Sequence, residues 1–356
     1  MAKIRRVGVP LKDFAGVKPC YGIKTGFNEA FLIDDATKKR IVQADPKSAE
    51  IIKPYLRGQD VKRWCSEWQS LWMIFARRGL DIDAYPAVKA HLSNYREQLE
   101  PRPKDWDSNQ NGDWKGRKPG SYEWYELQDS IDYWQLFEKP KIVYQEINTL
   151  PSYSLDASGY FNNNKVFLLP TADLFVLGCL NSPVGWWIAH RLFPKMIGGA
   201  VTPRGDLMID FPIAPPTDAI RAEVEPLVSR LIELTQTNQE ASSDVLNWLA
   251  IEHSIDKPGQ KLENFASLDV KEFVQELKKR RPRNAEIISP AALKAMQQVY
   301  NDYAPAIQTR KAEALQLERR LSDLVNQAYG LTPEEIDLMW KTAPPRMPIS
   351  RPLPPI

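Results

Sequence analysis

The proline-rich segment Phe211–Pro216 (FPIAPP) separates two kinds of sequence. Proline disfavours helix at its own position and at the residue before it, so we expect an extended linker here. Before the segment, short apolar runs alternate with turn residues, whereas after it apolar residues recur at helical spacing. The chain is therefore predicted to fold as two parts, residues 1–215 and 216–342, with a proline-rich tail at 343–356.

The front part combines strand-like and helix-like segments. The runs Ala30–Asp35, Lys141–Ile147 and Lys165–Pro170 are short, β-branched and aromatic, as strands are. Leu174–Phe193 predicts two helices with a break at Asn181–Pro183, and Pro86–Glu100 predicts a helix with proline in its first turn. We expect a mixed α/β domain.

The rear part has helical periodicity. One apolar stripe at 3.6-residue spacing comprises Val224, Leu227, Val228, Leu231 and Ile232. A long helix is predicted to begin at Ser289–Pro290 and to end at Gly330. Thr332, with glutamate three residues later, caps a further short helix. The fold class is thus α+β, a mixed domain followed by an all-helical spacer.

The composition is that of a globular protein, with 43% hydrophobic and 26% charged residues. No run approaches the roughly 20 apolar residues of a membrane-spanning helix, and no signal peptide follows Met1. The cysteines Cys20, Cys65 and Cys179 form no CxxC pair, and the chain has three histidines. We expect a cytoplasmic protein without disulfides, metal sites or contact with a membrane.

The net charge is +2, but the charges are unevenly distributed. Residues 1–80 hold 16 Lys and Arg against 8 Asp and Glu, while both later parts of the chain are slightly acidic. A polyanion would meet its attractive surface in the first eighty residues. Ordinary variation of a protein surface explains the same surplus equally well.

Catalytic motifs are absent. The sequence contains no phosphate-binding GxxxxGK[ST] loop, no GxGxxG, no GxSxG and no HExxH. It also lacks the Asn/Asp-Pro-Pro-aromatic motif of amino-methyltransferases. His190 follows an apolar run and is interpreted as a helix residue rather than a catalytic one. A binding role is favoured.

The segment Gly22–Asp34 (GIKTGFNEAFLID) is the first candidate binding site. Its two glycines allow a tight turn or a close approach to a ligand. Lys24 and Thr25 suit a phosphate, and Asn28 suits the edge of an adenine. The alternative is a structural glycine turn in which Asn28 bonds locally.

The segment Lys53–Trp64 (KPYLRGQDVKRW) is the second. Arg57 and Arg63 are candidates for guanine or phosphate contact, because a guanidinium fork matches both. Asp60 is positioned to brace one of them, which would be a structural role. Among the nearby tryptophans, Trp64 is expected to be partly exposed.

Two loops complete the set of candidates. In Pro101–Tyr125, tryptophans alternate with Lys115, Arg117 and Lys118, a pattern that suits nucleic-acid contact. The alternative is a loop held in place by its own tryptophans. The second loop, Lys195–Leu207, contributes Arg204.

Together these segments resemble the C-terminal half of type IIG restriction–modification enzymes, with a TaqI-like specificity domain. The resemblance rests on ordered motifs: Gly22–Phe31, Ile51–Trp64, Lys139–Ile147, Asp156 with Gly159–Tyr160, Leu177–Arg191, Ile209–Pro216 and Ala314–Trp340. Several motifs in one order are more specific than any single motif. They favour a binding role for Lys24, Thr25, Asn28 and Arg57.

The resemblance implies target recognition on double-stranded DNA for an adenine-N6 methyltransferase that uses S-adenosylmethionine, in phage defence. The methyltransferase domain and its cofactor site are missing from this chain, so we expect a fragment or a specificity subunit. Its partners would be double-stranded DNA and a methyltransferase domain or subunit, with or without a nuclease. Two alternatives stay open: a protein-interaction adaptor in phage defence, and an active DNA methyltransferase with an atypical cofactor site.

Overall fold

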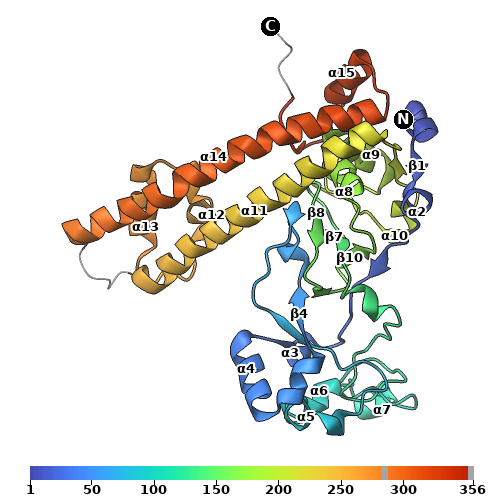
Figure 1. Cartoon of the computed structure of the whole chain (residues 1–356). Coiled ribbons are helices and arrows are strands. Elements are labelled where there is room, and N and C mark those ends of the chain that lie inside the picture. The colour runs from blue at the N-terminus through green and yellow to red at the C-terminus, as the bar shows by residue number, and fades with distance from the viewer. Residues whose placement is uncertain (283–287, 352–356) are drawn as a thin grey trace. The chain divides into compact units, whose positions relative to one another are not determined.

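The computed structural model describes residues 1–282 and 288–351, and the chain divides into two compact units (Figure 1). Unit 1 comprises Met1–Pro215 together with Thr332–Pro348, and unit 2 comprises Pro216–Leu331 and the chain end from Ile349. The division thus falls inside the proline-rich segment, between Pro215 and Pro216.

Unit 1 is built on two mixed sheets and a small ribbon. The five-stranded sheet has the order β2-β10-β7-β8-β5, antiparallel except for the β5–β8 pair. The four-stranded sheet has the order β3-β6-β4-β9, with β4 and β9 parallel, and β1 pairs with β11. The strands are β1 Val9–Pro10, β2 Cys20–Tyr21, β3 Leu32–Ile33, β4 Ile52–Leu56, β5 Trp64–Cys65, β6 Trp72–Ile74, β7 Lys141–Gln145, β8 Tyr153–Asp156, β9 Phe161–Asn162, β10 Val166–Leu169 and β11 Pro212–Ile213.

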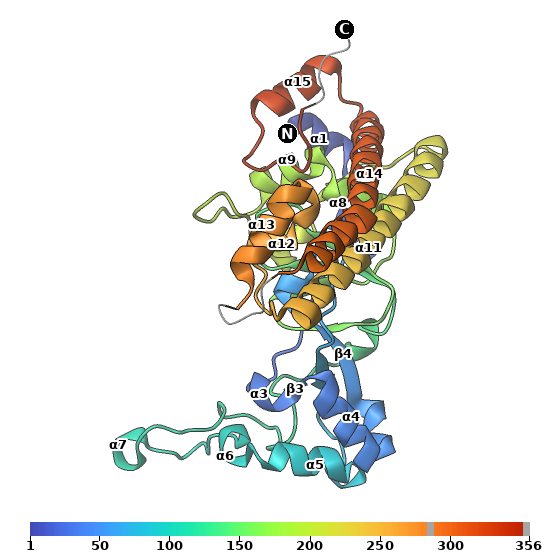
Figure 2. The ribbon, with the colours of Figure 1, turned by 90° about the vertical axis from the view of Figure 1, so that its left-hand side faces the viewer.

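Short helices surround these sheets (Figures 1 and 2). The α-helices of unit 1 are α1 Ala2–Val7, α2 Leu11–Phe14, α3 Asn28–Phe31, α4 Asp35–Ala44, α5 Pro86–Ser93, α6 Arg96–Leu99, α7 Ser108–Asn111, α8 Leu174–Asn181, α9 Pro183–Leu192, α10 Gly205–Met208 and α15 Pro333–Lys341. The 3-10 helices are η1 Pro46–Ile51, η2 Gly58–Asp60, η3 Ile82–Ala84 and η4 Trp134–Leu136. The mixture of sheets and helices confirms the predicted α+β class.

Two of the three predicted strands are confirmed as β7 and β10. The third prediction, a strand over Ala30–Asp35, is wrong for its first half. Ala30 and Phe31 belong to the helical turn α3, and only Leu32–Ile33 pair as a strand. The turn buries Ala30 and Phe31 together in one core, whereas a strand would have sent them to opposite faces.

The predicted break between α8 and α9 is confirmed. Ser182 caps α9 by accepting a hydrogen bond from the Gly185 N–H, and Pro183 occupies its first turn. A Cβ on Gly185 would lie 2.0 Å from the Cys179 carbonyl oxygen, so the two helices meet at this angle only with glycine there. The predicted helix Pro86–Glu100 is interrupted at Asn94–Tyr95, between α5 and α6.

Unit 2 consists of two long helices that lie side by side, with shorter helices at one end (Figure 1). These are α11 Asp218–His253 and α14 Pro290–Ala328, with α12 Gly259–Glu263, η5 Phe265–Ser267 and α13 Val270–Arg280. Arg230 of α11 contacts both carboxylate oxygens of Glu313 of α14, at 2.7 and 3.2 Å. Ser289 caps α14 and Gly330, at φ +63°, follows its end, as predicted.

The residues after Leu331 return to unit 1, whereas the predicted helical part extended to residue 342. Thr332 caps α15 with the predicted capping box to Glu335. The Trp187 indole N–H donates to Thr342 Oγ1 at 3.0 Å, and the Trp186 indole donates to the Pro345 carbonyl at 3.3 Å. These buried indoles need acceptors, and the chain end supplies them. Residues 352–356 of the predicted tail lie outside the described residues.

His190 of α9 makes the stability of unit 1 depend on pH. Burial, and then Lys195 and Arg191, lower its pKa from 6.5 to about 4. Because the folded pKa lies below the unfolded one, the associated stability is complete above pH 6.5 and is lost as the pH falls toward about 4. His190 packs edge-on against Trp186, with ring centroids 4.5 Å apart. Denaturant titrations across this pH range should show a smaller loss for His190→Phe, which keeps an aromatic ring, and equal losses would contradict the assignment.

Candidate functional site

The loop Gly22–Glu29 forms one wall of an open pocket of about 380 Å³. Lys24, Thr25 and Asn28, three of the residues proposed from the sequence, all line it. The opposite wall is Asn163 and Asn164, which follow β9. The structure therefore brings the predicted residues together and adds two asparagines that the sequence analysis missed. A run of three asparagines, Asn162–Asn164, was the available signal, and it is equally typical of a turn.

The two glycines of this loop are required by close approach. A Cβ on Gly22 would lie 1.9 Å from the Asn163 carbonyl oxygen, so only glycine allows the two walls to approach. Gly26 has φ +86°, and a Cβ there would lie 2.7 Å from Cδ of Arg117. A side chain at either position would clash with its neighbours, so the shape of the pocket depends on both glycines.

Lys24 and Asn28 present hydrogen-bond donors to the pocket. Thr25 is 2% exposed and its hydroxyl donates to Oδ1 of Asn28 at 2.7 Å. The side-chain N–H groups of Asn28 have no acceptor, and Lys24 no ion-pair partner, among residues 1–282 and 288–351. An ammonium and an amide that both retain free donors suit an anionic or carbonyl oxygen. Glu29 contributes one carboxylate to the lining.

Arg57 emerges beside this pocket because three chain segments run in the same direction. Ile23 forms a parallel bridge with Asn163, and Tyr55–Leu56 pair in parallel with Phe161–Asn162. The residues that follow these segments, Lys24, Asn164 and Arg57, therefore lie at the carboxyl ends of three neighbouring parallel segments. The tertiary structure thus places Arg57 next to the pocket.

Asp60 holds the Arg57 side chain in a fixed orientation, as its position in the sequence suggested. The buried carboxylate accepts from Nε at 3.0 Å, from one terminal nitrogen at 2.9 Å and from the Arg57 backbone N–H at 2.8 Å. These bonds, with Asp60 accepting them, raise the pKa of Arg57. An arginine braced on one edge of its guanidinium still presents the opposite edge to a ligand.

Arg117 requires a correction, because it is a structural residue and not a DNA contact. It is 4% exposed, and burial lowers its pKa to about 10. Its guanidinium donates to the carbonyl oxygens of Leu99, Thr25, Glu123, Trp124 and Glu126, at 2.7 to 3.3 Å. Arg117 therefore ties the Thr25 wall of the pocket to the loop that carries α7.

The neighbouring basic residues of that loop remain on the surface. Lys118 is exposed, and Lys115 is exposed in an ion pair with Glu97 at 3.0 Å. The loop is also stabilised by its own tryptophans: Trp106 and Trp114 pack edge-on at 4.8 Å, and Trp114 donates to the Glu100 carbonyl. The alternation of tryptophan and basic residues thus has a structural explanation here, with two lysines still available to a ligand.

Arg63 and Arg204 lie elsewhere on unit 1. Arg63 donates to the Asn181 carbonyl at 2.8 Å and lies 4.9 Å from the ring of Trp64. Trp64 is 3% exposed, so the expectation of partial exposure is wrong; its indole packs inside unit 1. Arg204 is exposed and forms a two-bond ion pair with Asp206, at 3.0 and 2.7 Å.

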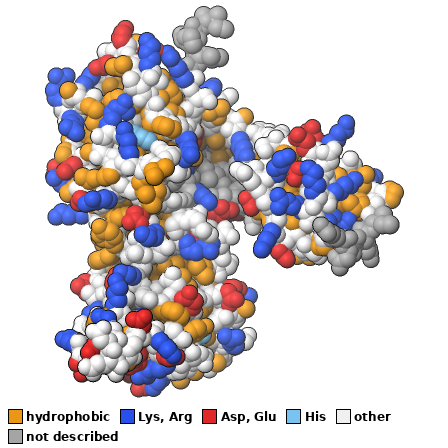
Figure 3. All heavy atoms as spheres, turned by 180° about the vertical axis from the view of Figure 1, so that it is seen from behind, with side chains coloured by type: hydrophobic (Ala, Val, Ile, Leu, Met, Phe, Trp, Pro, Cys, Tyr) orange, Lys and Arg blue, Asp and Glu red, His pale blue; other side chains and the backbone are white. Residues whose placement is uncertain are grey.

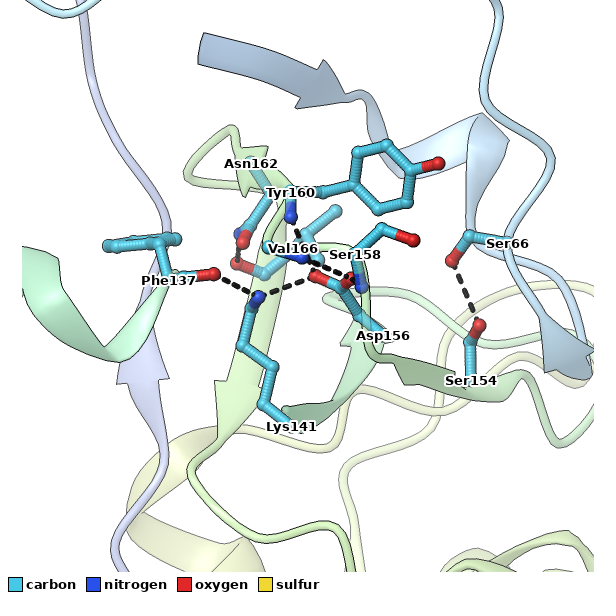
Figure 4. A network of polar contacts seen from close by, with 10 residues as sticks. Ser66, Phe137, Lys141, Ser154, Asp156, Ser158, Tyr160, Asn162 and Val166 are labelled. Carbon is cyan, nitrogen blue, oxygen red and sulfur yellow. Dashed lines mark hydrogen bonds and ion pairs between the residues drawn. The ribbon is translucent and has the colours of Figure 1, made fainter. Parts of the chain in front are cut away.

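A buried polar network that the sequence analysis did not identify supports β7 and β8 (Figure 4). Lys141 and Asp156, both fully buried, form an ion pair at 2.5 Å. Asp156 also accepts from the backbone N–H groups of Ser158, Gly159 and Tyr160. Desolvation lowers the pKa of Lys141 and raises that of Asp156. The lysine directly precedes the buried residues Ile142, Val143 and Tyr144 of β7, and this was the one sequence signal for a buried charge.

Charged side chains of both signs are interspersed over the face of unit 1 in Figure 3. The three cysteines are free. Within residues 1–282 and 288–351, no cluster of His, Cys, Asp and Glu is arranged to hold a metal ion, and no helix is both long and apolar enough to cross a membrane. The pocket lined by Lys24, together with the neighbouring side chain of Arg57, is therefore the strongest candidate site.

Comparisons with known proteins find a family match that includes Arg57, Asn163 and Asn164 but begins after Lys24, Thr25 and Asn28. Residues 53–204 match the TaqI-like C-terminal specificity domain, and residues 217–325 match a domain of unknown function, DUF8810. No curated protein matches significantly. A solved structure of the type IIL restriction-modification enzyme MmeI in complex with DNA is similar over 92% of this chain, with a TM-score of 0.50 and 15% identity. The chain spans 35% of that enzyme's length, and at this identity the likeness establishes the fold.

These matches identify the class of the domain. Residues 53–204 match the TaqI-like C-terminal specificity domain, and this match supports a target-recognition domain in unit 1. The resemblance predicted from the ordered motifs is confirmed. The matched range ends inside unit 1, and the helical unit 2 corresponds to the second family.

Proposed function

We propose that unit 1 recognises a specific sequence in double-stranded DNA on behalf of a restriction–modification enzyme. The observation that carries the proposal is the pocket of Lys24, Thr25 and Asn28, whose neighbour Arg57 lies in the range matched by the specificity domain. Lys24, Asn28 and Arg57 contribute free donors and positive charge, which a phosphate backbone and the acceptor atoms of bases both require, while Thr25 holds Asn28 in place.

The work is divided among these residues in the proposal. Lys24 contacts a phosphate and contributes affinity without sequence preference. Asn28 and the braced guanidinium of Arg57 contact acceptors, and an arginine fork pairs with guanine in the major groove. The exposed Lys115, Lys118 and Arg204 add contacts to the flanking backbone. Thr25 and Arg117 keep the pocket wall in place and do not touch DNA.

The partner in this proposal is an adenine-N6 DNA methyltransferase domain or subunit of the type IIG kind, acting in the cytoplasm in phage defence. S-adenosylmethionine is assigned to that partner and not to this chain. Unit 2 serves as a helical spacer, since its paired helices α11 and α14 give a stiff support. The whole enzyme flips the target adenine out of the duplex to reach its amino group.

A salt titration of the Lys24→Ala variant tests the proposal. The duplex is first selected by the wild-type chain from a randomised library. We expect Lys24→Ala to bind about tenfold more weakly, because one charge-assisted contact is lost. The slope of log K against log salt should fall by about 1, and selected and scrambled duplexes should be affected alike.

The matched control is Lys257→Ala, which removes an exposed lysine from unit 2. It should leave affinity and salt slope unchanged. Failure of the wild-type chain to enrich any sequence from the library would contradict the proposed function. If Lys24→Ala bound DNA with the affinity and the salt slope of the wild-type chain, the pocket would have no part in DNA binding.

A further inference from the structure

The hairpin between α9 and α10 presents an exposed apolar tip. Ile197 is fully exposed, at 104% of the reference area, and Met196 is 45% exposed. Exposing a whole isoleucine side chain forgoes the stabilisation that its burial would provide. A single exposed apolar residue is common on proteins, but two at the end of one projecting turn define a convex apolar point.

The tip is held rigidly. The Met196 N–H donates to the Ala200 carbonyl at 2.8 Å, and the Gly199 N–H donates back to the Met196 carbonyl at 3.2 Å. Gly198 and Gly199, at φ +82° and +77°, close the turn. Lys195 and Val201 pair below it, and Val201 exchanges two backbone hydrogen bonds with Asn148. The side chains of Met196 and Ile197 are therefore presented by a fixed scaffold.

A second apolar loop lies beside the hairpin. The bridge between Asn148 and Val201 places Ile147 and Leu150, each 42% exposed, next to it. Asn148 itself is 1% exposed, and neither atom of its side-chain amide has a hydrogen-bond partner in the described parts of the chain. Such unpaired buried groups are costly and rare in folded proteins.

This apolar tip lies on the same side of unit 1 as other candidate contacts. In Figure 2 the yellow-green hairpin projects to the same side as the loop with α7, which carries Lys115 and Lys118. Tyr21, 56% exposed, pairs with Phe167 on the neighbouring strands, and the Lys24 pocket follows two residues after β2. The tip, Tyr21 and the pocket thus belong to one end of the five-stranded sheet.

The size and charge of the tip favour DNA over a protein partner. A stable protein interface needs about 800 Å² on each side, far more than two side chains offer. A convex apolar point is the shape that enters between stacked base pairs, and isoleucine and methionine are among the residues that do so. Lys195, exposed and outside any ion pair of the described residues, stands directly before the tip and can contact a phosphate.

We propose that the Met196–Ile197 tip inserts between neighbouring base pairs of the bound duplex and partly unstacks them. The inference rests on the proposed function of unit 1 and adds a site to it. Ile197 is the wedge, Met196 broadens it, and Lys195 holds the adjacent phosphate. Inserted in this way, the tip covers apolar surface that is otherwise exposed to water, which offsets the lost base stacking.

Fluorescence of 2-aminopurine tests the insertion, because the base brightens when it is unstacked. The probe is placed in turn at each adenine position of the duplex that the wild-type chain selects. We expect the wild-type chain to raise the fluorescence at one step. Ile197→Ala should abolish that rise and weaken binding about tenfold, equivalent to about 1.4 kcal/mol. Because the Ile197 side chain is fully exposed to solvent, the variant should fold normally.

Three further variants sharpen the test. Ile197→Leu should retain the fluorescence rise, since the wedge stays apolar. Ile197→Lys should lose the rise while still binding unselected DNA, because it exchanges a wedge for a charge. Ile251→Ala, which removes an exposed isoleucine from α11, should behave as wild type.

The outcomes distinguish insertion of the tip from the proposed function of unit 1. Binding by the wild-type chain with no fluorescence rise at any step would overturn the insertion and leave the proposed function standing. A rise that persists in Ile197→Ala would also overturn it. An Ile197→Ala variant that loses self-association, measured by sedimentation, but keeps both DNA signals would assign the tip to a second copy of the chain. Absence of any DNA binding by the wild-type chain would overturn both proposals.

Discussion

Replacing Arg117 by alanine is expected to lower the free energy of unfolding of unit 1 by about 3–5 kcal/mol, at the upper end for a single substitution. The guanidinium serves five backbone carbonyl groups from three parts of the chain, and burial prevents water from replacing it. Its loss leaves these acceptors unpaired and frees the Thr25 wall of the pocket.

Urea denaturation followed by tryptophan fluorescence measures this effect. Lys118→Ala, at the next position but exposed, is the matched control and should change stability by less than about 0.5 kcal/mol. Arg117→Lys should be intermediate, because an ammonium has three donors and lacks the planar fork. Where Arg117→Lys remains folded, it should also weaken DNA binding through the displaced Thr25 wall. Equal stability of Arg117→Ala and Lys118→Ala would refute the structural role.

Removing Asp156 should be the second large perturbation, at about 3–5 kcal/mol, because it isolates a buried charge. Asp156→Ala leaves the ammonium of Lys141 with the Phe137 carbonyl alone and three backbone N–H groups without an acceptor. Lys141→Met should cost less, since the remaining carboxylate still accepts those three N–H groups. The order of the two losses is the prediction.

Asp156→Asn is the informative control, because its amide oxygen still accepts backbone N–H groups while the negative charge is removed. Denaturation of the variants should rank Asp156→Ala as least stable, with Asp156→Asn and Lys141→Met above it. A Lys141→Met variant less stable than Asp156→Ala would show that the ion pair, rather than the backbone contacts of Asp156, dominates the site.

Local patterns were sufficient to predict most elements. Helix caps depend on residues three apart, so Ser289 and Thr332 marked the starts of α14 and α15 correctly, and the break predicted at Asn181–Pro183 fell where α9 begins. The strands β7 and β10 carry runs of apolar residues that any fold must bury. The prediction for Ala30–Asp35 was half wrong, because a short apolar run fits a helical turn as well as a strand.

Some residues of the candidate site could also be predicted from the sequence, and others could not. The spacing in Gly22–Asn28 identified Lys24, Thr25 and Asn28, because glycines next to polar residues indicate a loop that approaches something closely. Arg117 and Lys118 look equivalent as neighbours in sequence, yet one is buried and the other exposed. No local pattern separates them, since the acceptors of Arg117 come from residues 25, 99 and 123–126.

The sequence by itself determined the class of this protein: an α+β chain with a specificity domain, recognisable from ordered motifs that depend on local chemistry. The tertiary structure decided which basic side chains remain available to a ligand. It set Arg57 beside the Lys24 pocket through parallel pairing of three segments, buried Arg117 and Lys141 among acceptors, and left Ile197 exposed on a rigid turn. Burial and pairing arise between residues distant in sequence, and therefore the same residue type serves as a core tie at one position and as a candidate DNA contact at another.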